Sequence, residues 1–389
     1  MHRLRDPRFF LIALFLGILA AVPLLQTIME VRQESGIHAL ELFSETPTAE
    51  NLRAFEKNLE KTSWAARISR PWLQFAQFAW FKDGGEKVVV GSSGWYFYKP
   101  GLLYMAARPE TRAKENDTND PVAAIIHFRD QLAAHGIRLL VMPIPNKDTI
   151  YPDRLTSRIK SPQIALAPRT GEILERLKAA KVQTIDLFQE FALARQQGSG
   201  SVQETPLYLA QDTHWSPAGV AVAAKAAARR LAELGWLNPG EVAYSERPAP
   251  VQRMGDLVRM LQSPVIERSL KPEQVNTAQV IRGADQLYKD EAEAEILVLG
   301  DSFMRIYQQD APESAGFIAH LAKELRQPML SIVNDGGGST LVREELSSGP
   351  VFLKNKKVMI WGFVERDFGL GIKGWQHVKL PAPVALQQQ

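Results

Sequence analysis

The sequence predicts an α/β fold, with a parallel sheet flanked by helices, behind an N-terminal transmembrane helix. From residue 120 onward, helical segments alternate with short and almost continuously apolar runs, which is the pattern of parallel strands buried on both faces. A separate apolar segment stands near the N-terminus. The predicted strands occupy residues 137–142, 182–187, 296–299, 329–333 and 358–361.

The N-terminal segment, residues 9–29, contains no charge and is long enough to cross a bilayer. Arg3, Arg5 and Arg8 precede it and Glu30 follows, so the positive-inside rule leaves the start in the cytoplasm and exports the rest. We therefore expect residues 1–30 to form an uncleaved single-pass anchor in the inner membrane, with the remaining chain in the periplasm. A cleaved signal peptide is the alternative, although residues 18–20 make a mediocre cleavage site.

Composition narrows the possible functions. The chain has 389 residues, of which 45% are hydrophobic, enough for one large domain or two ordinary ones. Lys and Arg together number 46 against 43 acidic residues, so there is no broad basic field and nucleic acid is not an expected partner. The absence of cysteine excludes disulfides, thiolate zinc sites and cysteine nucleophiles. No motif predicts a metal or a cofactor.

Three regions follow the anchor. Residues 31–84 are predicted to be a helical lead-in, with a helix start at Thr46-Pro47 and an aromatic-rich stretch from Trp64 to Trp80 that we interpret as packing. Residues 85–380 are predicted to form the α/β domain, which opens with a strand-turn-strand hairpin. Within it, residues 198–201 read as a flexible Gly-Ser loop, and residues 237–290 as a proline-interrupted insertion or linker.

Two local motifs suggest nucleophilic chemistry. The strand at 295–299 breaks into Gly300-Asp301-Ser302, which places a serine on a tight turn at the carboxyl end of a buried strand. Upstream, Asp212 and His214 are two residues apart on an extended segment, so their side chains fall on the same side. Ser302 as nucleophile, His214 as base and Asp212 as orienting carboxylate would form a relay. A simple turn and a structural histidine are the alternative interpretation.

These residues resemble the SGNH hydrolase fold, but with the Asp/His segment ahead of the serine, so the resemblance implies a circular permutation. Such a permuted domain behind a membrane segment is similar to the alginate O-acetyltransferase family of the AlgJ and AlgX type, and the length fits the AlgJ type best. The motifs appear in that family's order and cover most of residues 85–370: 94–98, 143–147 with Tyr151-Pro152, 212–216, 300–303 and 365–366.

The resemblance implies an O-acetyltransferase that moves acetyl through an acetyl-serine onto hydroxyls of an exported polysaccharide, with mannuronate residues of alginate as the leading acceptor. Because acetyl-CoA is cytoplasmic, the donor would be a membrane-bound partner of the O-acyltransferase type. The backbone N–H of Ser302, Gly337 and the phenol of Tyr307 are candidate oxyanion donors. Arg366 and Lys147 are candidates for binding an anionic uronate, with solvated or salt-bridged side chains as the alternative.

Two other functions use the same residues. A periplasmic acetylesterase needs the same relay with water as the acceptor. A non-catalytic polysaccharide-binding subunit of an export or acetylation complex would carry an inert Ser302. The acceptor, rather than the relay, distinguishes the transferase from the esterase.

Overall fold

The computed structural model describes residues 7–33, 36–43, 46, 48–107, 119–159, 163–198 and 205–382. The chain divides into two compact units. The N-terminal unit contains residues 1–83 and 262–269, and the α/β unit contains residues 84–261 and 270–389. Pro47 of the predicted helix start, and all but the first residue of the predicted 198–201 loop, lie outside the described residues.

The N-terminal unit is helical. Its elements are α1 (Pro7–Arg32), the 3₁₀ helix η2 (His38–Phe43), α2 (Ala49–Thr62), α3 (Trp64–Phe81) and α12 (Pro264–Ser269). Thr48 caps α2 by accepting a hydrogen bond from the backbone N–H of Asn51 at 3.2 Å. Within α1, the most apolar stretch of Arg8–Arg32 has a mean hydropathy of 2.5 and none of it is buried, so this helix is long and apolar enough to cross a membrane.

A five-stranded parallel sheet organises the α/β unit. The strand order is β12-β11-β13-β4-β5, and every neighbouring pair is parallel. This confirms the predicted fold class, with all five predicted strands in one sheet; the second is shorter than expected. The strands are β4 (Arg138–Ile144), β5 (Gln183–Thr184), β11 (Ile296–Gly300), β12 (Leu330–Val333) and β13 (Val358–Val364).

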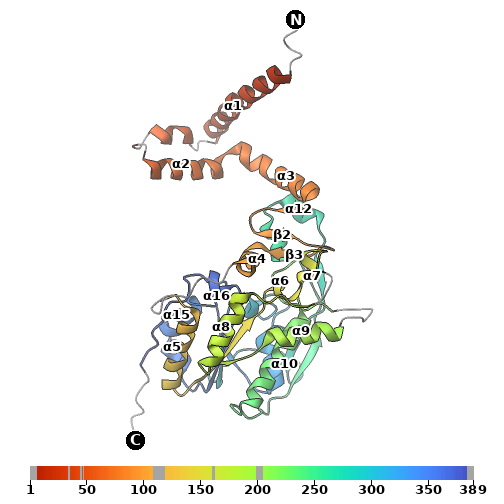
Figure 1. The fold of residues 1–389 in the computed structure, drawn as a ribbon, viewed down its shortest axis with the longest axis vertical. Helices are drawn as coiled ribbons and strands as arrows, with labels where there is room; N and C mark the ends of the chain where they lie inside the picture. Colours follow the sequence, from red (N-terminus) through yellow and green to blue (C-terminus); the bar gives the residue numbers. More distant parts are fainter. Residues whose placement is uncertain are drawn as a thin grey trace. The chain divides into compact units, whose positions relative to one another are not determined.

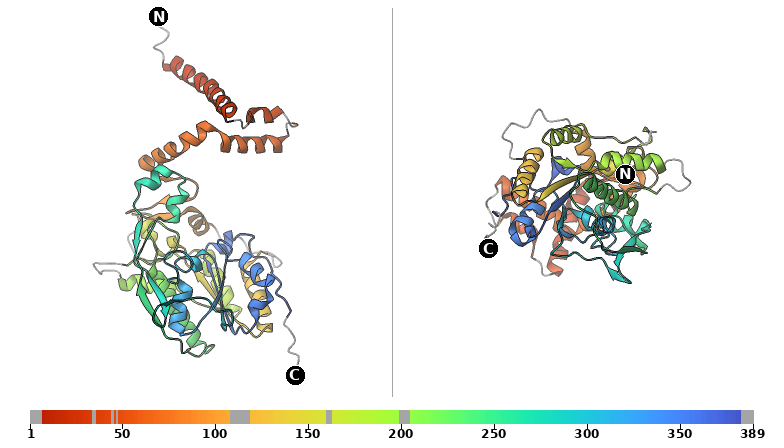
Figure 2. Two further views of the ribbon diagram at one scale, coloured as in Figure 1. Left: turned by 180° about the vertical axis from the view of Figure 1, so that it is seen from behind. Right: turned by 90° about the horizontal axis from the view of Figure 1, so that it is seen from below.

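Helices cover both faces of this sheet, which is why its strands are apolar almost throughout. Alternate residues of β4 belong to two separate cores: Leu140 and Met142 pack on one side, and Leu139 and Val141 on the other. Figures 1 and 2 show the two helical layers. The first is formed by α9 (Leu187–Gly198), α10 (Pro217–Glu233) and α14 (Phe317–Leu325), and the second by α5 (Pro121–Ala134), α8 (Pro168–Ala179) and α15 (Leu341–Ser348).

The predicted hairpin is present as β2 (Val88–Val90) and β3 (Tyr96–Tyr98). The short strand β1 (Asp83–Gly84) lies next to β2 in the same sheet, and α4 (Lys99–Ala106) follows β3. The segment predicted as an insertion or linker carries two small antiparallel sheets and a short helix. One sheet contains β6 (Tyr244–Pro248), β9 (Ala278–Arg282) and β10 (Gln286–Leu287). The other contains β7 (Val251–Arg253) and β8 (Glu273–Val275), with α11 (Asp256–Met260) between them in the chain.

Short elements follow the carboxyl ends of the central strands, where parallel α/β sheets bind ligands. They are α6 (Lys147–Ile150) and α7 (Pro152–Leu155) after β4, α13 (Ser302–Arg305) after β11, and α16 (Asp367–Leu370) after β13. The 3₁₀ helix η3 (Pro350–Leu353) leads into β13. The candidate residues Lys147, Ser302, Tyr307 and Arg366 lie on these elements or directly beside them, whereas Asp212 and His214 lie on the loop before α10 and Gly337 follows β12.

Candidate active site

Ser302 is the first residue of α13, directly after β11. The turn is tight because a Cβ on Gly300 would lie 2.2 Å from the Met304 side chain and 3.2 Å from the carbonyl oxygen of Gly362. Asp301 holds the turn: its Oδ1 accepts from the backbone N–H of Phe303 at 2.9 Å, and its Oδ2 from that of Val364 at 3.1 Å. The serine is thus fixed to the end of the neighbouring strand β13 as well.

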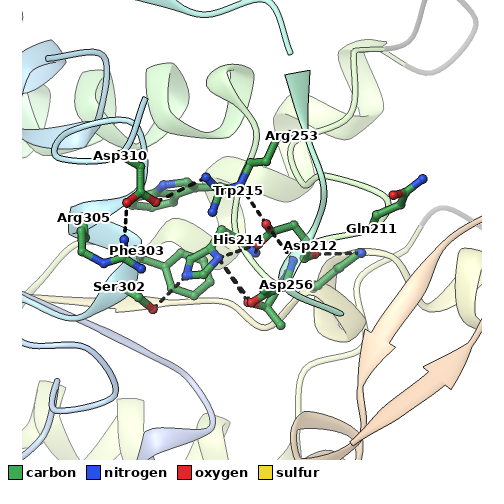
Figure 3. Close-up of polar contacts among 12 residues, drawn as sticks. Gln211, Asp212, His214, Trp215, Arg253, Asp256, Ser302, Phe303, Arg305 and Asp310 are labelled. Carbon is green, nitrogen blue, oxygen red and sulfur yellow. Dashed lines mark hydrogen bonds and ion pairs between the residues drawn. The ribbon is translucent and has the colours of Figure 1, made fainter. Parts of the chain in front are cut away.

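The three relay residues form one continuous hydrogen-bonded chain (Figure 3). The Nε2 atom of His214 lies 2.8 Å from Ser302 Oγ, and its Nδ1 atom lies 2.6 Å from Asp212 Oδ1. Asp212 is fully buried and His214 is 6% exposed. An N–H at Nδ1 donates to the carboxylate and leaves Nε2 as an acceptor for the serine proton. Asp212 and His214 therefore lie on one side of their loop, as the two-residue spacing predicts.

The helix α10 fixes the end of the loop that carries Asp212 and His214. Ser216 is the N-cap of α10 and accepts hydrogen bonds from the backbone N–H groups of Ala218 at 3.2 Å and Gly219 at 3.4 Å. Pro217 occupies the first helical position, where its missing N–H costs nothing. The His214 ring also packs against Phe303, with ring centroids 4.8 Å apart. The imidazole is thus held by packing as well as by hydrogen bonds.

The electrostatics favour an ionised Asp212 beside a basic His214. Burial alone would raise the pKa of Asp212, but His214 and Arg253 hold it well below its usual range. Burial alone would lower the pKa of His214, but the charge and hydrogen bond of Asp212 outweigh it and the net shift is upward. A raised imidazole pKa makes His214 a stronger base toward Ser302.

Two residues that the sequence did not suggest complete the support of Asp212. Arg253 Nε donates to Asp212 Oδ2 at 2.9 Å, and the backbone N–H of Asp256 donates to the same oxygen at 3.2 Å. The carboxylate of Asp256 accepts from the backbone N–H of Thr213 at 2.7 Å and lies 3.7 Å from His214 Nδ1. Both residues come from the segment predicted as an insertion or linker, and their only sequence signal is a pair of charges around a glycine.

Asp212, His214 and Asp256 together lie close enough to bind a metal ion, with all ligand atoms within 4.8 Å of one another. Their atoms are already engaged, however. Both oxygens of Asp212 accept two N–H groups each, and one of these donors is the guanidinium of Arg253. A neighbouring fixed cation disfavours a second one, so the arrangement suits a proton relay better than a metal centre.

Lys147 corrects one expectation. It is buried, and its Nζ donates to three backbone carbonyl oxygens, those of Tyr96 at 2.6 Å, Ala210 at 2.8 Å and Asp212 at 3.1 Å. An ammonium group has three protons, so none remains for a sugar carboxylate. Burial lowers the pKa of Lys147 to about 7. Lys147 supports the loop that carries Asp212, and the prediction that it binds uronate is wrong.

The predicted oxyanion donors Gly337 and Tyr307 are also engaged elsewhere. The N–H of Gly337 donates to the carbonyl oxygen of Asn334 at 2.9 Å. Tyr307 is fully buried, and its hydroxyl faces the carbonyl oxygen of Trp215 at 3.4 Å. Gly338 lies closer to the serine turn, because a Cβ placed on it would be 3.1 Å from Asp301 Oδ2. Among the described residues, the backbone N–H groups of Ser302 and Gly338 have no hydrogen-bond acceptor.

Arg366 remains available. It lies just after β13, is partly exposed, and its guanidinium stands 5.0 Å from the centre of the Tyr98 ring. Burial raises the pKa of Asp301, and the positive charge of Arg366 is among the effects that lower it, so the guanidinium acts on the residue next to Ser302. Within the described part of the chain, no carboxylate oxygen lies within 4.0 Å of the Arg366 nitrogens.

Comparison with known proteins identifies the family. Residues 88–365 match the family model described as the SGNH hydrolase-like domain of acetyltransferase AlgX. The chain belongs to this family. This confirms the resemblance read from the motifs.

Individual relatives are similar in sequence as well. The chain is 27% identical over 322 residues to the probable alginate O-acetylase AlgJ of Pseudomonas fluorescens, covering 80% of this chain and 73% of that protein. It is 25% identical over 383 residues to the probable alginate O-acetylase AlgJ of Pseudomonas syringae pv. tomato, covering 93% and 88%.

Two solved structures show the same fold. The O-acetyltransferase domain of Pseudomonas putida AlgJ superposes with a TM-score of 0.58 at 23% identity, covering 73% of this chain and 92% of that one. Pseudomonas aeruginosa AlgX superposes with a TM-score of 0.52 at 18% identity, covering 71% of this chain and 61% of that one.

Proposed function

We propose that this chain is an O-acetyltransferase that acetylates hydroxyl groups of alginate, by way of an acetyl-serine on Ser302. The observation that carries the proposal is the unbroken hydrogen-bonded chain from Asp212 through His214 to Ser302. Membership of the acetyltransferase AlgX family and similarity to proteins named as probable alginate O-acetylases support the acetyl group and the acceptor. Mannuronate hydroxyls are the proposed acceptors within the polymer.

The relay supports transfer in two half-reactions. Ser302 Oγ attacks the acetyl carbonyl while His214 Nε2 takes its proton, and His214 then returns that proton to the departing group of the donor. In the second half, a sugar hydroxyl gives its proton to His214 and attacks the acetyl-serine. Ser302 leaves and regains the proton, so atoms and charges balance. Asp212 keeps its negative charge throughout and stabilises the imidazolium.

Oxyanion stabilisation in both half-reactions needs fixed donors. The backbone N–H groups of Ser302 and Gly338 are the proposed donors, in place of Gly337 and Tyr307. Arg366 is the proposed contact for a uronate carboxylate, because it carries a full charge beside the serine turn without an ion-pair partner among the described residues.

The proposed location follows from α1. A helix of this length and hydropathy is suited to act as an uncleaved inner-membrane anchor, with the α/β unit in the periplasm. Acetyl-CoA is confined to the cytoplasm, so the acetyl group would reach Ser302 from a membrane-bound partner of the O-acyltransferase type.

The test follows acetyl from a chromogenic acetyl ester to mannuronate oligomers by mass spectrometry, with the full chain in detergent. Ser302→Ala is the test variant. Ser347→Ala is its control, because Ser347 is a partly exposed serine of α15 outside the relay. We expect the wild type and Ser347→Ala to add acetyl to the sugar and Ser302→Ala to lose this activity. Acetate release without sugar acetylation would make the protein an esterase, and equal activity in all three would refute a catalytic Ser302.

A further inference from the structure

The helix α3 has an unusual composition for the surface of a soluble unit. It contains two arginines, Arg67 and Arg70, and no acidic residue. Six of its residues are aromatic: Trp64, Trp72, Phe75, Phe78, Trp80 and Phe81. The neighbouring α2 differs, because it alternates acidic and basic residues along its length. The aromatic content therefore distinguishes α3 from α2.

Several large apolar side chains of α3 are exposed and are not used for packing. No residue of this helix is buried. Ile68 is 52% exposed, Trp72 62%, Leu73 60% and Trp80 79%. The rotation of about 100° per residue places these four within an arc of about 140°. The interpretation of the aromatic stretch as packing does not hold for this face.

The opposite side of α3 is polar. Arg67, Arg70, Gln74 and Gln77 fall within an arc of about 80° on the other side of the helix, by the same rotation. Phe81, at the last position, is the exception on this side. A helix with an aromatic apolar face and a cationic polar face is suited to lie in the plane of a membrane surface.

Hydrogen bonds fix the start of α3 to the end of α1. Gln26 Oε1 accepts from the backbone N–H of Trp64 at 2.6 Å, and Gln26 Nε2 faces the carbonyl oxygen of Thr62 at 3.4 Å. The distance along α1 from Arg8 to Gln26 is about 27 Å, from 1.5 Å per residue. The hydrocarbon core of a bilayer is about 30 Å thick. A spanning α1 therefore brings the start of α3 to the boundary between hydrocarbon and headgroups.

We propose that α3 lies in the membrane surface, with the face formed by Ile68, Trp72, Leu73 and Trp80 in the acyl boundary and its arginines among anionic headgroups. Tryptophan is enriched at this depth because its ring is apolar and its N–H is polar. Because α3 carries no acidic residue, the positive charges of Arg67 and Arg70 complement the negative surface of an anionic bilayer. The proposal rests on the proposed anchor role of α1.

The absence of cysteine makes a clean test possible, because one introduced thiol is the only labelling site. The full chain is reconstituted into vesicles of phosphatidylethanolamine and phosphatidylglycerol, and an environment-sensitive fluorophore is attached to Ile68→Cys or Leu73→Cys. Gln77→Cys, at an exposed position of the polar face, is the matched control. Quenching by nitroxide-labelled lipid and by aqueous iodide is then compared.

We expect lipid quenching to be several-fold stronger at Ile68→Cys and Leu73→Cys than at the Gln77→Cys control, with the opposite order for iodide. Vesicles of phosphatidylcholine alone should weaken the lipid contact, because the arginines lose their anionic partners. Equal quenching at positions 68, 73 and 77 would overturn the proposal. Shielding of position 73 from both quenchers would also overturn it, since that result indicates a protein contact.

A probe at Leu16→Cys separates this proposal from the anchor on which it rests. Leu16 lies midway along α1, so a spanning helix places it deep in the hydrocarbon and out of reach of iodide. Strong lipid quenching at Leu16 with none at Leu73 would refute the surface helix while keeping the anchor. Loss of lipid quenching at both positions would refute both.

Discussion

Replacement of Asp212 by asparagine tests the proposed relay most sharply, because the structure uses both carboxylate oxygens fully. Oδ1 accepts from the backbone N–H of His214 at 3.1 Å and from its Nδ1 at 2.6 Å. Oδ2 accepts from Arg253 at 2.9 Å and from the backbone N–H of Asp256 at 3.2 Å. Asparagine has one oxygen and one NH₂ group in place of the two carboxylate oxygens. One of the two pairs of donors must therefore face the NH₂ group, which is itself a donor.

The orientation of the new amide is set by Arg253. A guanidinium cannot give up its proton to become an acceptor, so the amide oxygen should face Arg253 and the NH₂ group should face His214. His214 Nδ1 must then accept, which moves the imidazole proton to Nε2, opposite Ser302. In that tautomer His214 cannot take the serine proton. We expect kcat to fall about 10³- to 10⁴-fold, or about 4–5.5 kcal/mol.

A second substitution distinguishes this tautomer effect from loss of charge. In Asp212→Asn combined with Arg253→Met, the amide oxygen is free to turn toward His214, which restores the productive tautomer. We expect the double variant to transfer acetyl about tenfold faster than Asp212→Asn alone, a lowering of the barrier by about 1.4 kcal/mol. Transfer to mannuronate oligomers is measured by mass spectrometry. Asp212→Asn activity within about tenfold of wild type, or a double variant weaker than Asp212→Asn, would refute the reasoning.

Three other outcomes follow from the described contacts. The raised pKa of His214 should place the acid limb of the kcat/KM profile above pH 6.5, with activity lost as pH falls, because only the neutral imidazole accepts a proton; a limb below 6.5 would contradict the Asp212 contact. Lys147→Met should destabilise the fold by about 3–5 kcal/mol in denaturant titrations, because three buried carbonyl groups lose their donor; a change in KM alone would instead restore a substrate role. Gly255→Ala should lower both stability and transfer, since its Cβ would lie 1.9 Å from the Gln211 carbonyl oxygen, whereas Gly171→Ala, with its nearest contact at 3.7 Å, should change neither by more than a small amount.

The sheet and the relay were predictable because their signals are local. Buried parallel strands are apolar on both faces, so each appears in the sequence as a short apolar run. The serine turn and the Asp-x-His loop are likewise complete within a few residues. The strand at 182–187 was overestimated because its last residues, including Leu187, begin α9.

Contacts between residues far apart in the sequence could not be predicted from it. Arg253 and Asp256 lie 41 and 44 residues from the carboxylate that they support, and the pairing of β7 with β8 that positions Arg253 leaves no periodic signal. Lys147 was misread for a related reason. A lysine next to a strand end looks like a ligand contact in sequence, and only the fold shows three carbonyl groups converging on it.

The excursion of residues 262–269 into the N-terminal unit has a practical consequence. Ser263 Oγ donates to the carbonyl oxygen of Pro71 at 2.9 Å, so these residues complete a helical unit whose other members all precede residue 84. Residues 262–269 begin soon after Asp256 and end shortly before Glu273 in the sequence. Glu273 accepts a hydrogen bond from the backbone N–H of Gln211 at 2.6 Å. A truncation at residue 84, the natural choice for a soluble fragment, keeps every relay residue. It also removes α3, which residues 262–269 pack against, and the segments on both sides of these residues contact the loop of Asp212. Low activity in such a fragment would therefore result from the truncation and would not show that the full chain is inactive.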